Sequence, residues 1–339
     1  MKKVSNLLVT DAEENIRVDR WFKRHFPTLS HSFIAKLTRT GQVRVDGARV
    51  KSSTRLQKGQ LVRVPPLKLI INSKKQRDIS DLSKDQISFI RSLVIYMDDD
   101  IIVVNKPPGL AVQGGSKTLF HLDGLLNGLK FGGLERPKLV HRLDRDTSGI
   151  MLLARNSFSA AHLISSFRNR EITKVYWALV VGVPEPRLGE INAPISKKKK
   201  FGIEKMGLDK RNGSKAISDF STIETAGRYV SWLALRPHTG RTHQLRVHCS
   251  LIGTPILGDF KYGGKQAFID GVPRTRNLHL HARSLEFKHP SGVKKSFVAP
   301  LSEEMDQTWQ FFGFNAAKTF DAFSEWETKE KIKCLSLHE

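Results

Sequence analysis

The chain has 339 residues, of which 39% are hydrophobic and 26% are charged, and this composition excludes a wholly disordered chain. Its 56 Lys and Arg residues outnumber its 33 Asp and Glu residues and give a formal net charge of +23 at pH 7. Such an excess of positive charge opposes compaction unless a polyanion binds. It therefore favours a nucleic acid as the partner, with an anionic membrane as the alternative.

The membrane alternative weakens because the apolar runs are far shorter than the about 20 residues that span a bilayer, and the N-terminus has no signal-peptide pattern. The two cysteines, Cys249 and Cys334, form no Cys-x-x-Cys pair. This argues against a disulfide framework and favours a reducing, cytoplasmic location. The length predicts two domains, or one large domain with appendages.

Residues 15–65 are predicted to form a small basic unit. The first 70 residues hold 15 Lys or Arg and five Asp or Glu. Apolar spacing predicts one helix over 17–25 and a second that starts at Ser30 or Ser32 and ends near Gly41.

A hairpin is predicted next, because residues 42–50 alternate around an Asp46-Gly47 turn. A further strand is predicted over 61–64, where Pro65 and Pro66 follow it. Two helices and a small sheet thus make up the predicted unit.

This unit resembles the alpha-L RNA-binding module, the ribosomal protein S-four-like domain. The resemblance rests on the Ser-x-Ser start at 30–32, on Arg-Thr-Gly-Gln-Val-Arg-Val-Asp-Gly at 39–47 and on Lys-Gly-Gln-Leu-Val at 58–62. It implies RNA binding by the cationic side chains of Lys36, Arg39, Arg44 and Arg49. A solvated basic helical face without a ligand is the alternative.

Residues 66–90 are polar and basic and predict a linker. From 91 to 300, strands and helices mix without a regular βαβ period, so we expect an α+β fold and not a doubly wound sheet. The clearest expected elements are strands over 101–104, 175–181 and 230–235 and a helix over 158–167.

Residues 301–339 are predicted to pack on the core as terminal helices. Aromatic and small residues recur there at near-helical spacing: Trp309, Phe312, Ala316, Phe320 and Phe323. From 300 on, eight acidic residues face four lysines, which argues against RNA contact.

Residues 141–149, His-Arg-Leu-Asp-Arg-Asp-Thr-Ser-Gly, form the densest polar stretch and precede an apolar run. Asp144 has arginines close by on both sides in sequence, and a guanidinium within about 4–6 Å would favour its ionised form. An ionised carboxylate suits a nucleophile or a charge stabiliser. An Arg–Asp network that only ties the loop is the alternative.

Residues 236–248 contain three histidines and three arginines. His243 and His248 are five residues apart, which puts them on different faces of a helix or a strand. A protein-bound metal is therefore not expected, and the arginines fit phosphate or carboxylate contacts better.

Residues 174–182 read as a strand on which Trp177 and Tyr176 point to opposite sides. Tyr176 is by default a core aromatic residue. The alternative is a platform beneath a base that has been flipped out of its stack.

Together these stretches resemble the RluA-type pseudouridine synthases over residues 93–300. The resemblance is carried by the complete motifs at 141–149, at 174–182 (Lys-x-Tyr-x-Ala-x-Val-x-Gly) and at 239–248 (Thr-Gly-Arg-Thr-His-Gln-Leu-Arg-Val-His). The runs at 105–116 look most like the RluC branch, which acts on large-subunit ribosomal RNA. The resemblance implies a mainly antiparallel catalytic domain.

The resemblance also implies roles for individual residues. Asp144 matches the catalytic aspartate, which attacks the uridine at the anomeric carbon or after glycal formation. Tyr176 matches the tyrosine on the target base, and Arg246 the arginine thought to pair with the aspartate. Arg142 matches a residue that takes the space of the flipped base. We also expect Arg241 and His243 to contact RNA. No cofactor is expected, because the isomerisation involves no net redox change. A monomer is also expected.

Two other function classes remain open. One is an RNA-binding ribosome-assembly factor with an idle site, against which the intact Asp144, Tyr176 and Arg246 argue. The other is a metal-dependent hydrolase that uses Asp144, Asp146, Asp259 and the histidines. Phosphate contact and a solvated loop are equally open for the lysine run at 197–200.

Overall fold

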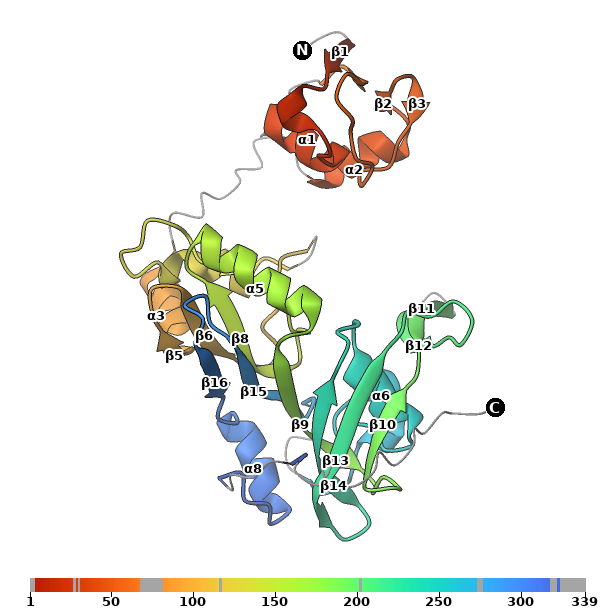
Figure 1. The fold of residues 1–339 in the computed structure, drawn as a ribbon. Coiled ribbons are helices and arrows are strands. Elements are labelled where there is room, and N and C mark those ends of the chain that lie inside the picture. The colour runs from red at the N-terminus through yellow and green to blue at the C-terminus, as the bar shows by residue number, and fades with distance from the viewer. Residues whose placement is uncertain are drawn as a thin grey trace. The chain divides into compact units, whose positions relative to one another are not determined.

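The computed structural model describes residues 4–26, 29, 31–67, 82–115, 118–200, 203–272, 277–317 and 322–323 (Figure 1). The chain divides into two compact units, Met1–Asp78 and Ile79–Glu339. Helices and mainly antiparallel strands mix within the chain, so the predicted α+β class is confirmed.

The first unit combines two helices with a four-stranded antiparallel sheet in the order β1-β4-β2-β3. Its elements are β1 (Ser5–Leu8), the 3-10 turn η1 (Asp11–Glu13), α1 (Val18–His25), α2 (His31–Arg39), β2 (Arg44–Val45), β3 (Ala48–Arg49) and β4 (Leu61–Val64). The predicted Asp46-Gly47 turn is confirmed, because both residues have positive φ, 49° and 80°. This is the backbone that a two-residue hairpin turn requires.

The first unit begins earlier than the predicted residue 15. Strand β1 pairs with β4, Leu7 opposite Val62, and Val9 is buried in the same core as Trp21 and Phe22. A four-residue strand is too short to show a periodicity in the sequence. Only its pairing with β4, which is distant in sequence, assigns β1 to this unit.

The N-cap prediction for α2 is wrong at Ser32, because the helix already starts at His31; Ser30 lies outside the described residues. The linker prediction is wrong for residues 83–90. Helix α3 (Lys84–Ser92) starts there with a capping box formed by Ser83 and Gln86, and it buries Ile90. Residues 68–81 lie outside the described part of the chain.

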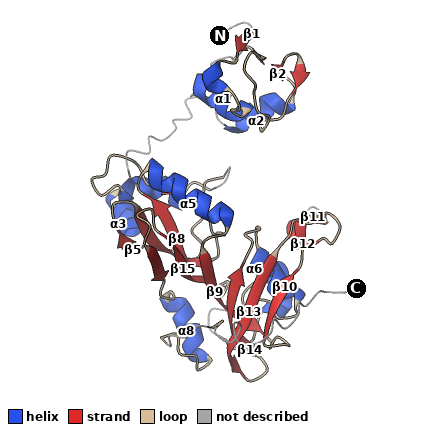
Figure 2. Cartoon of the chain, viewed as in Figure 1, coloured by secondary structure: helices blue, strands red, loops and turns tan. Residues whose placement is uncertain are grey.

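The second unit contains a ten-stranded sheet along which β10-β13-β14-β9-β15-β8-β6-β5 follow one another, with β16 beside β15 and β7 beside β8 (Figure 2). Among its described strand pairs, β8 with β15 is parallel and the others are antiparallel. The strands are β5 (Val94–Met97), β6 (Ile101–Lys106), β7 (Lys138–Leu139), β8 (Ser148–Ala154), β9 (Thr173–Val181), β10 (Leu188–Asn192), β13 (Ile217–Ala226), β14 (Val230–Pro237), β15 (Leu280–Lys288) and β16 (Lys294–Val298).

Short helices connect and cover this sheet. They are α4 (Leu122–Leu125), η2 (Leu126–Leu129), α5 (Ser157–Asn169), α6 (Gln244–Leu251), α7 (Phe260–Gly263), η3 (Gly264–Ala267) and α8 (Glu303–Phe311). Side chains of β9 alternate between the two faces. Ala178 packs with Leu245 of α6, whereas Trp177 packs with Trp309 of α8, so the two helices cover opposite faces.

Two sequence expectations change in this unit. In the tail, α8 buries Met305 and Trp309, but residues 312–317 form no further helix, and Phe320 lies outside the described residues. The lysine run is a strand and not a loop. It lies in β11 (Ile195–Lys200), which pairs with β12 (Ile203–Leu208), and Lys197 is ion-paired with Glu204.

Candidate active site

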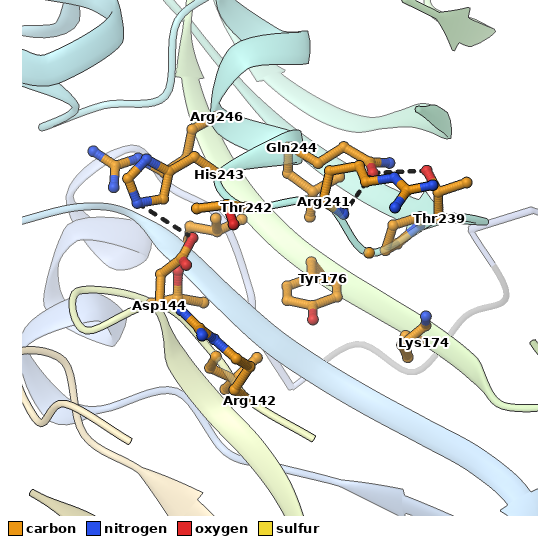
Figure 3. Close-up of a pocket in the computed structure, with 16 residues that line it drawn as sticks. Arg142, Asp144, Lys174, Tyr176, Thr239, Arg241, Thr242, His243, Gln244 and Arg246 are labelled. Carbon is orange, nitrogen blue, oxygen red and sulfur yellow. Dashed lines mark hydrogen bonds and ion pairs between the residues drawn. The ribbon is translucent and has the colours of Figure 1, made fainter. Parts of the chain in front are cut away.

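The three sequence stretches meet at one cavity of about 220 Å³ near the middle of the large sheet. The loop before β8 supplies Asp144, β9 supplies Tyr176, and the loop from β14 into α6 supplies His243 and Arg246 (Figure 3). Two further predicted residues line the cavity, Arg142 and Arg241. The lining also includes four residues that were not predicted: Lys174, Thr239, Thr242 and Gln244.

The loop that carries Asp144 is anchored by Lys106, the last residue of β6. Its ammonium group is fully buried and donates hydrogen bonds to the carbonyl oxygens of Pro107, Leu110 and Arg145 at 2.8–2.9 Å. Burial lowers the Lys106 pKa to about 7, although the charges of Asp146 and Asp144 oppose this shift. Three carbonyl acceptors thus tie the loop that carries Asp144 to the loop after β6.

Gly149 fixes where this loop enters the sheet. It has a φ of +106°, and a Cβ at this position would lie 2.3 Å from the carbonyl oxygen of Ala282. Ala282 is its partner in the parallel β8–β15 pair. Only glycine fits both the backbone conformation and the close strand approach.

The side chain of Asp144 is 23% exposed, and one carboxylate oxygen lies 3.9 Å from His243 Nε2. The flanking arginine Arg145 contacts Asp146 at 2.8 Å and not Asp144. The loop-tying Arg–Asp network is therefore present, but it uses Asp146 and leaves Asp144 open to the cavity.

Arg246 forms its two-pronged contact with Asp259, at 2.8 and 2.7 Å, and both side chains are almost completely buried. The expected pairing with Asp144 is thus not the contact that the structure shows. Burial lowers the pKa of Arg246, but the hydrogen bonds that it donates to Asp259 and the nearby charges of Asp259 and Asp144 outweigh burial and raise the pKa. Asp259 also caps α7 by accepting the N–H of Tyr262.

His243 is in the left-handed backbone region, with a φ of 54°, and its Nδ1 lies 2.6 Å from the hydroxyl oxygen of Tyr262. That hydroxyl oxygen accepts a hydrogen bond from the N–H of Met206 in β12. Burial lowers the pKa of His243; the charge of Asp144 opposes this shift, whereas Arg246 and Lys261 add to it. A neutral imidazole is therefore favoured beside Asp144.

Tyr176 faces the cavity from β9, opposite Leu235 on one neighbouring strand and Ala282 on the other (Figure 3). Burial raises the pKa of its phenol, and the charge of Asp144 adds to the shift, so the ring carries a neutral hydroxyl. Lys174, two residues earlier on the same strand, has its pKa lowered by burial and by Arg170. Tyr176 packs on the core, as its default interpretation expects, and it also lines the cavity. Its role as a platform for a base stays a prediction.

The histidines of the 236–248 stretch lie in three separate places. His238 contacts Asp219, and His248 is buried against Ser218 and the carbonyl oxygen of Ala193. Within the described ranges, no three His, Cys, Asp or Glu residues are arranged so that they could hold a metal ion. His141 is structural: it accepts the N–H of Leu152, and burial lowers its pKa to about 3.

The basic residues predicted in the first unit are exposed: Lys36, Arg39, Arg44 and Arg49. Arg39 and Arg49 line one shallow groove together with Lys51. Arg44 is held in the hairpin by the carbonyl oxygens of Gly41 and Gly47. In the second unit, Arg241 donates to the carbonyl oxygen of Lys215.

Sequence reasoning missed Lys106, Lys174 and Tyr262, and it assigned Asp259 only to a hydrolase. Lys106 and Lys174 lie inside family-like runs, and Tyr262 lies outside them, but none of the three carried a chemical signal of its own. Among the described helices, none is long and apolar enough to cross a membrane.

Comparisons with known proteins agree on one family. A family model described as RNA pseudouridylate synthase matches residues 100–251. The chain is 34% identical over 278 residues to a Rickettsia conorii protein named ribosomal large subunit pseudouridine synthase C, covering 79% of this chain and 88% of that protein. A Vibrio parahaemolyticus protein of the same name is 34% identical over 305 residues, covering 86% and 91%. The solved structure of human RNA pseudouridylate synthase domain containing 4 superposes with a TM-score of 0.56 at 28% identity, covering 67% of this chain and 97% of that one.

Proposed function

This chain belongs to the RNA pseudouridylate synthase family and is an RNA pseudouridine synthase, and from that premise we propose that it isomerises specific uridines of large-subunit ribosomal RNA. The names of the bacterial relatives support this choice of RNA. A cytoplasmic location and a monomeric state stay predictions.

The observation that carries the proposal is the convergence of Asp144, Tyr176 and Arg246 on one cavity. The reaction breaks the bond between N1 of uracil and C1′ of ribose and joins C5 to C1′. A proton leaves C5, and N1 ends with a proton, so the net change is an isomerisation. It requires a nucleophile or charge stabiliser, a surface for the detached base and control of one proton.

We assign Asp144 as the nucleophile, because its carboxylate lines the cavity, whereas the neighbouring Arg145 forms its ion pair with Asp146. Tyr176 offers its ring to the uracil and a neutral hydroxyl to the proton transfer. Arg246, held by Asp259, supplies a fixed positive charge beside Asp144. Arg142 lines the cavity where it can replace the flipped base.

We assign RNA affinity mainly to basic side chains that take no part in making or breaking bonds. The net charge of +23 and the groove with Arg39 and Arg49 in the first unit fit phosphate contacts. Arg241 and His243 lie at the cavity and are proposed to contact the RNA there. An assembly factor with an idle site is not favoured, because the relatives are named pseudouridine synthases and Asp144, Tyr176 and Arg246 line one cavity.

The test is the conversion of uridine in an unmodified large-subunit rRNA transcript, followed by mapping of the modified positions. Asp144→Asn should abolish conversion and leave RNA affinity within about a few-fold, because affinity resides in many phosphate contacts. Asp85→Asn, an exposed carboxylate on α3, is the matched control and should convert normally. Near-normal conversion by Asp144→Asn would place the chemistry elsewhere.

A further inference from the structure

A second cavity of about 710 Å³ adjoins the active-site cavity. The two share Arg142, Leu143, Asp144, Thr242, His243 and Arg246 along their linings. A chain that delivers a nucleotide to Asp144 therefore has room for a neighbouring nucleotide beside it. We call this second cavity the flanking groove.

One wall of the flanking groove is the ring of Phe260, which is 72% exposed. An exposed aromatic ring alone means little, because single apolar residues are common on protein surfaces. Phe158 on α5 is 73% exposed, but it lines none of the described cavities around the site. The position of Phe260 in a groove continuous with the catalytic site therefore distinguishes it.

Phe260 is also held in place. It follows Asp259, which caps α7 and pairs with Arg246, and its ring lies 6.4 Å from that of Phe268. The same carboxylate thus fixes both the catalytic arginine and the start of the helix that presents the ring. An anchored backbone removes part of the ordering cost when a ligand stacks on the ring.

The remaining lining supplies groups for a nucleotide. Lys261 and Arg145 are exposed cations, of which Arg145 is ion-paired with Asp146 in the same lining. The Gln113 side chain provides an amide that can donate to and accept from a base edge. An aromatic ring flanked by cations is the arrangement that binds unpaired nucleotides, the ring stacking on the base and the cations contacting phosphate.

We propose that the flanking groove binds an unpaired nucleotide next to the target uridine, with its base stacked on Phe260 and its phosphate near Arg145 and Lys261. The inference rests on the proposed function and deepens it, because it makes the substrate single-stranded at that position. It also assigns a substrate-binding role to a residue outside the sequence stretches that carry the family resemblance.

The binding test uses a single-stranded hexauridylate that carries one 2-aminopurine, placed at each position in turn. Stacking on Phe260 should quench the 2-aminopurine fluorescence on binding. Phe260→Ala should abolish the quenching and weaken affinity by about 5- to 100-fold. Phe260→Trp should retain both, and Phe158→Ala, with matched exposure, should behave as the wild type.

The kinetic test uses the large-subunit rRNA segment around the mapped target, with each flanking nucleotide replaced in turn by an abasic one. At the stacked position, the abasic substitution and Phe260→Ala should each lower kcat/KM, and the two together should cost no more than either alone. At the other positions the two losses should multiply.

Losses that multiply at every position, or an affinity that Phe260→Ala leaves unchanged, would overturn the proposal and leave the ring to another occupant, such as a protein. Because Phe260 is exposed, the variant should fold, and an unchanged Tm checks this. If the wild type converts no uridine, the proposed function fails, whereas the quenching result still decides whether the groove stacks a base.

Discussion

His243 and Tyr262 share a 2.6 Å hydrogen bond between Nδ1 and the phenol oxygen. Because the phenol oxygen also accepts the N–H of Met206, we infer that it donates its own proton to Nδ1. A neutral His243 then carries its proton on Nε2, the nitrogen that lies 3.9 Å from Asp144. Tyr262 thereby aims a donor at the carboxylate that we assign as nucleophile.

We predict that Tyr262→Phe lowers kcat by about 2- to 10-fold, the equivalent of one hydrogen bond, with KM little changed. The ring and its contact with Arg246 are retained, but His243 is free to protonate on Nδ1. Since the neutral form loses a partner, the His243 pKa should rise, and the acid limb of the kcat profile should move to higher pH. Tyr229→Phe, at an exposed tyrosine, is the control. An acid limb that stays in place would rule out this role.

We predict that Tyr176→Phe binds RNA normally but turns over slowly, whereas Tyr176→Ala also loses base placement. Phenylalanine keeps the stacking surface, worth about 1–3 kcal/mol, and removes only the hydroxyl. Single-turnover rates and RNA affinities of the two variants separate these effects. If Tyr176→Phe matches the wild type in rate, the hydroxyl has no chemical role and the ring acts by packing alone.

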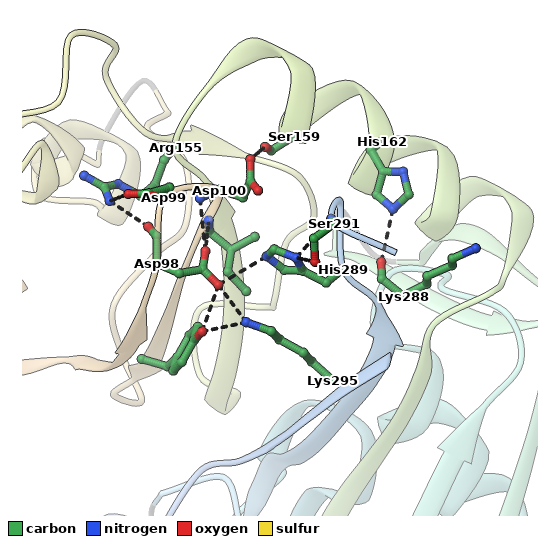
Figure 4. Close-up of polar contacts among 12 residues, drawn as sticks. Asp98, Asp99, Asp100, Arg155, Ser159, His162, Lys288, His289, Ser291 and Lys295 are labelled. Carbon is green, nitrogen blue, oxygen red and sulfur yellow. Dashed lines mark hydrogen bonds and ion pairs between the residues drawn. The ribbon is translucent and has the colours of Figure 1, made fainter. Parts of the chain in front are cut away.

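Away from the site, Asp98 in the turn between β5 and β6 joins that turn to the β15–β16 hairpin (Figure 4). Its carboxylate accepts hydrogen bonds from Lys295 and Tyr96 at 2.8 Å and from the backbone of Ile101 at 2.9 Å. Burial raises the Asp98 pKa, but these hydrogen bonds outweigh it and hold the pKa well below its ordinary value.

A carboxylate with a lowered pKa stabilises the fold above its unfolded-state pKa, and the stabilisation is lost as the pH falls toward the folded-state pKa. We predict that Asp98→Asn lowers the free energy of unfolding by about 2 kcal/mol at pH 7. The difference from the wild type should shrink below about pH 4. Urea unfolding at several pH values measures it, with the exposed Asp99→Asn as control. A difference that is constant with pH would contradict the charge-based explanation.

We predict that removal of residues 1–78 leaves the second unit folded, because its core is separate from that of the first. The deletion retains Leu82, which packs on the same core as α3, and Ser83, which caps that helix. A longer deletion would therefore destabilise α3.

If the first unit binds RNA, this truncation should weaken affinity and raise KM, with kcat largely retained. For single-stranded RNA, the plot of log affinity against log salt should flatten by about 0.7 for every phosphate that the truncated protein no longer neutralises. A salt titration of RNA binding measures this slope. An unchanged slope would exclude the first unit as an RNA-binding unit.

Local sequence patterns were sufficient for the elements whose backbone is decided locally. The Asp46-Gly47 turn needs two positive φ angles, and those residue types tolerate them. The alternation that sends Trp177 away from Tyr176 follows from the two-residue period of any strand. The family-like motif at 141–149 likewise singles out Asp144 as the candidate nucleophile from sequence alone.

Tertiary structure alone decided which residues meet. The parallel pairing of β8 with β15 puts Gly149 against Ala282, far away in sequence, and no local pattern predicts that register. Arg246 pairs with Asp259 and not with Asp144, because the start of α7 places the Asp259 carboxylate against it and both side chains are buried there. Partner choice among charged groups depends on distance and desolvation, and both are set by the assembled sheet and not by neighbours along the chain.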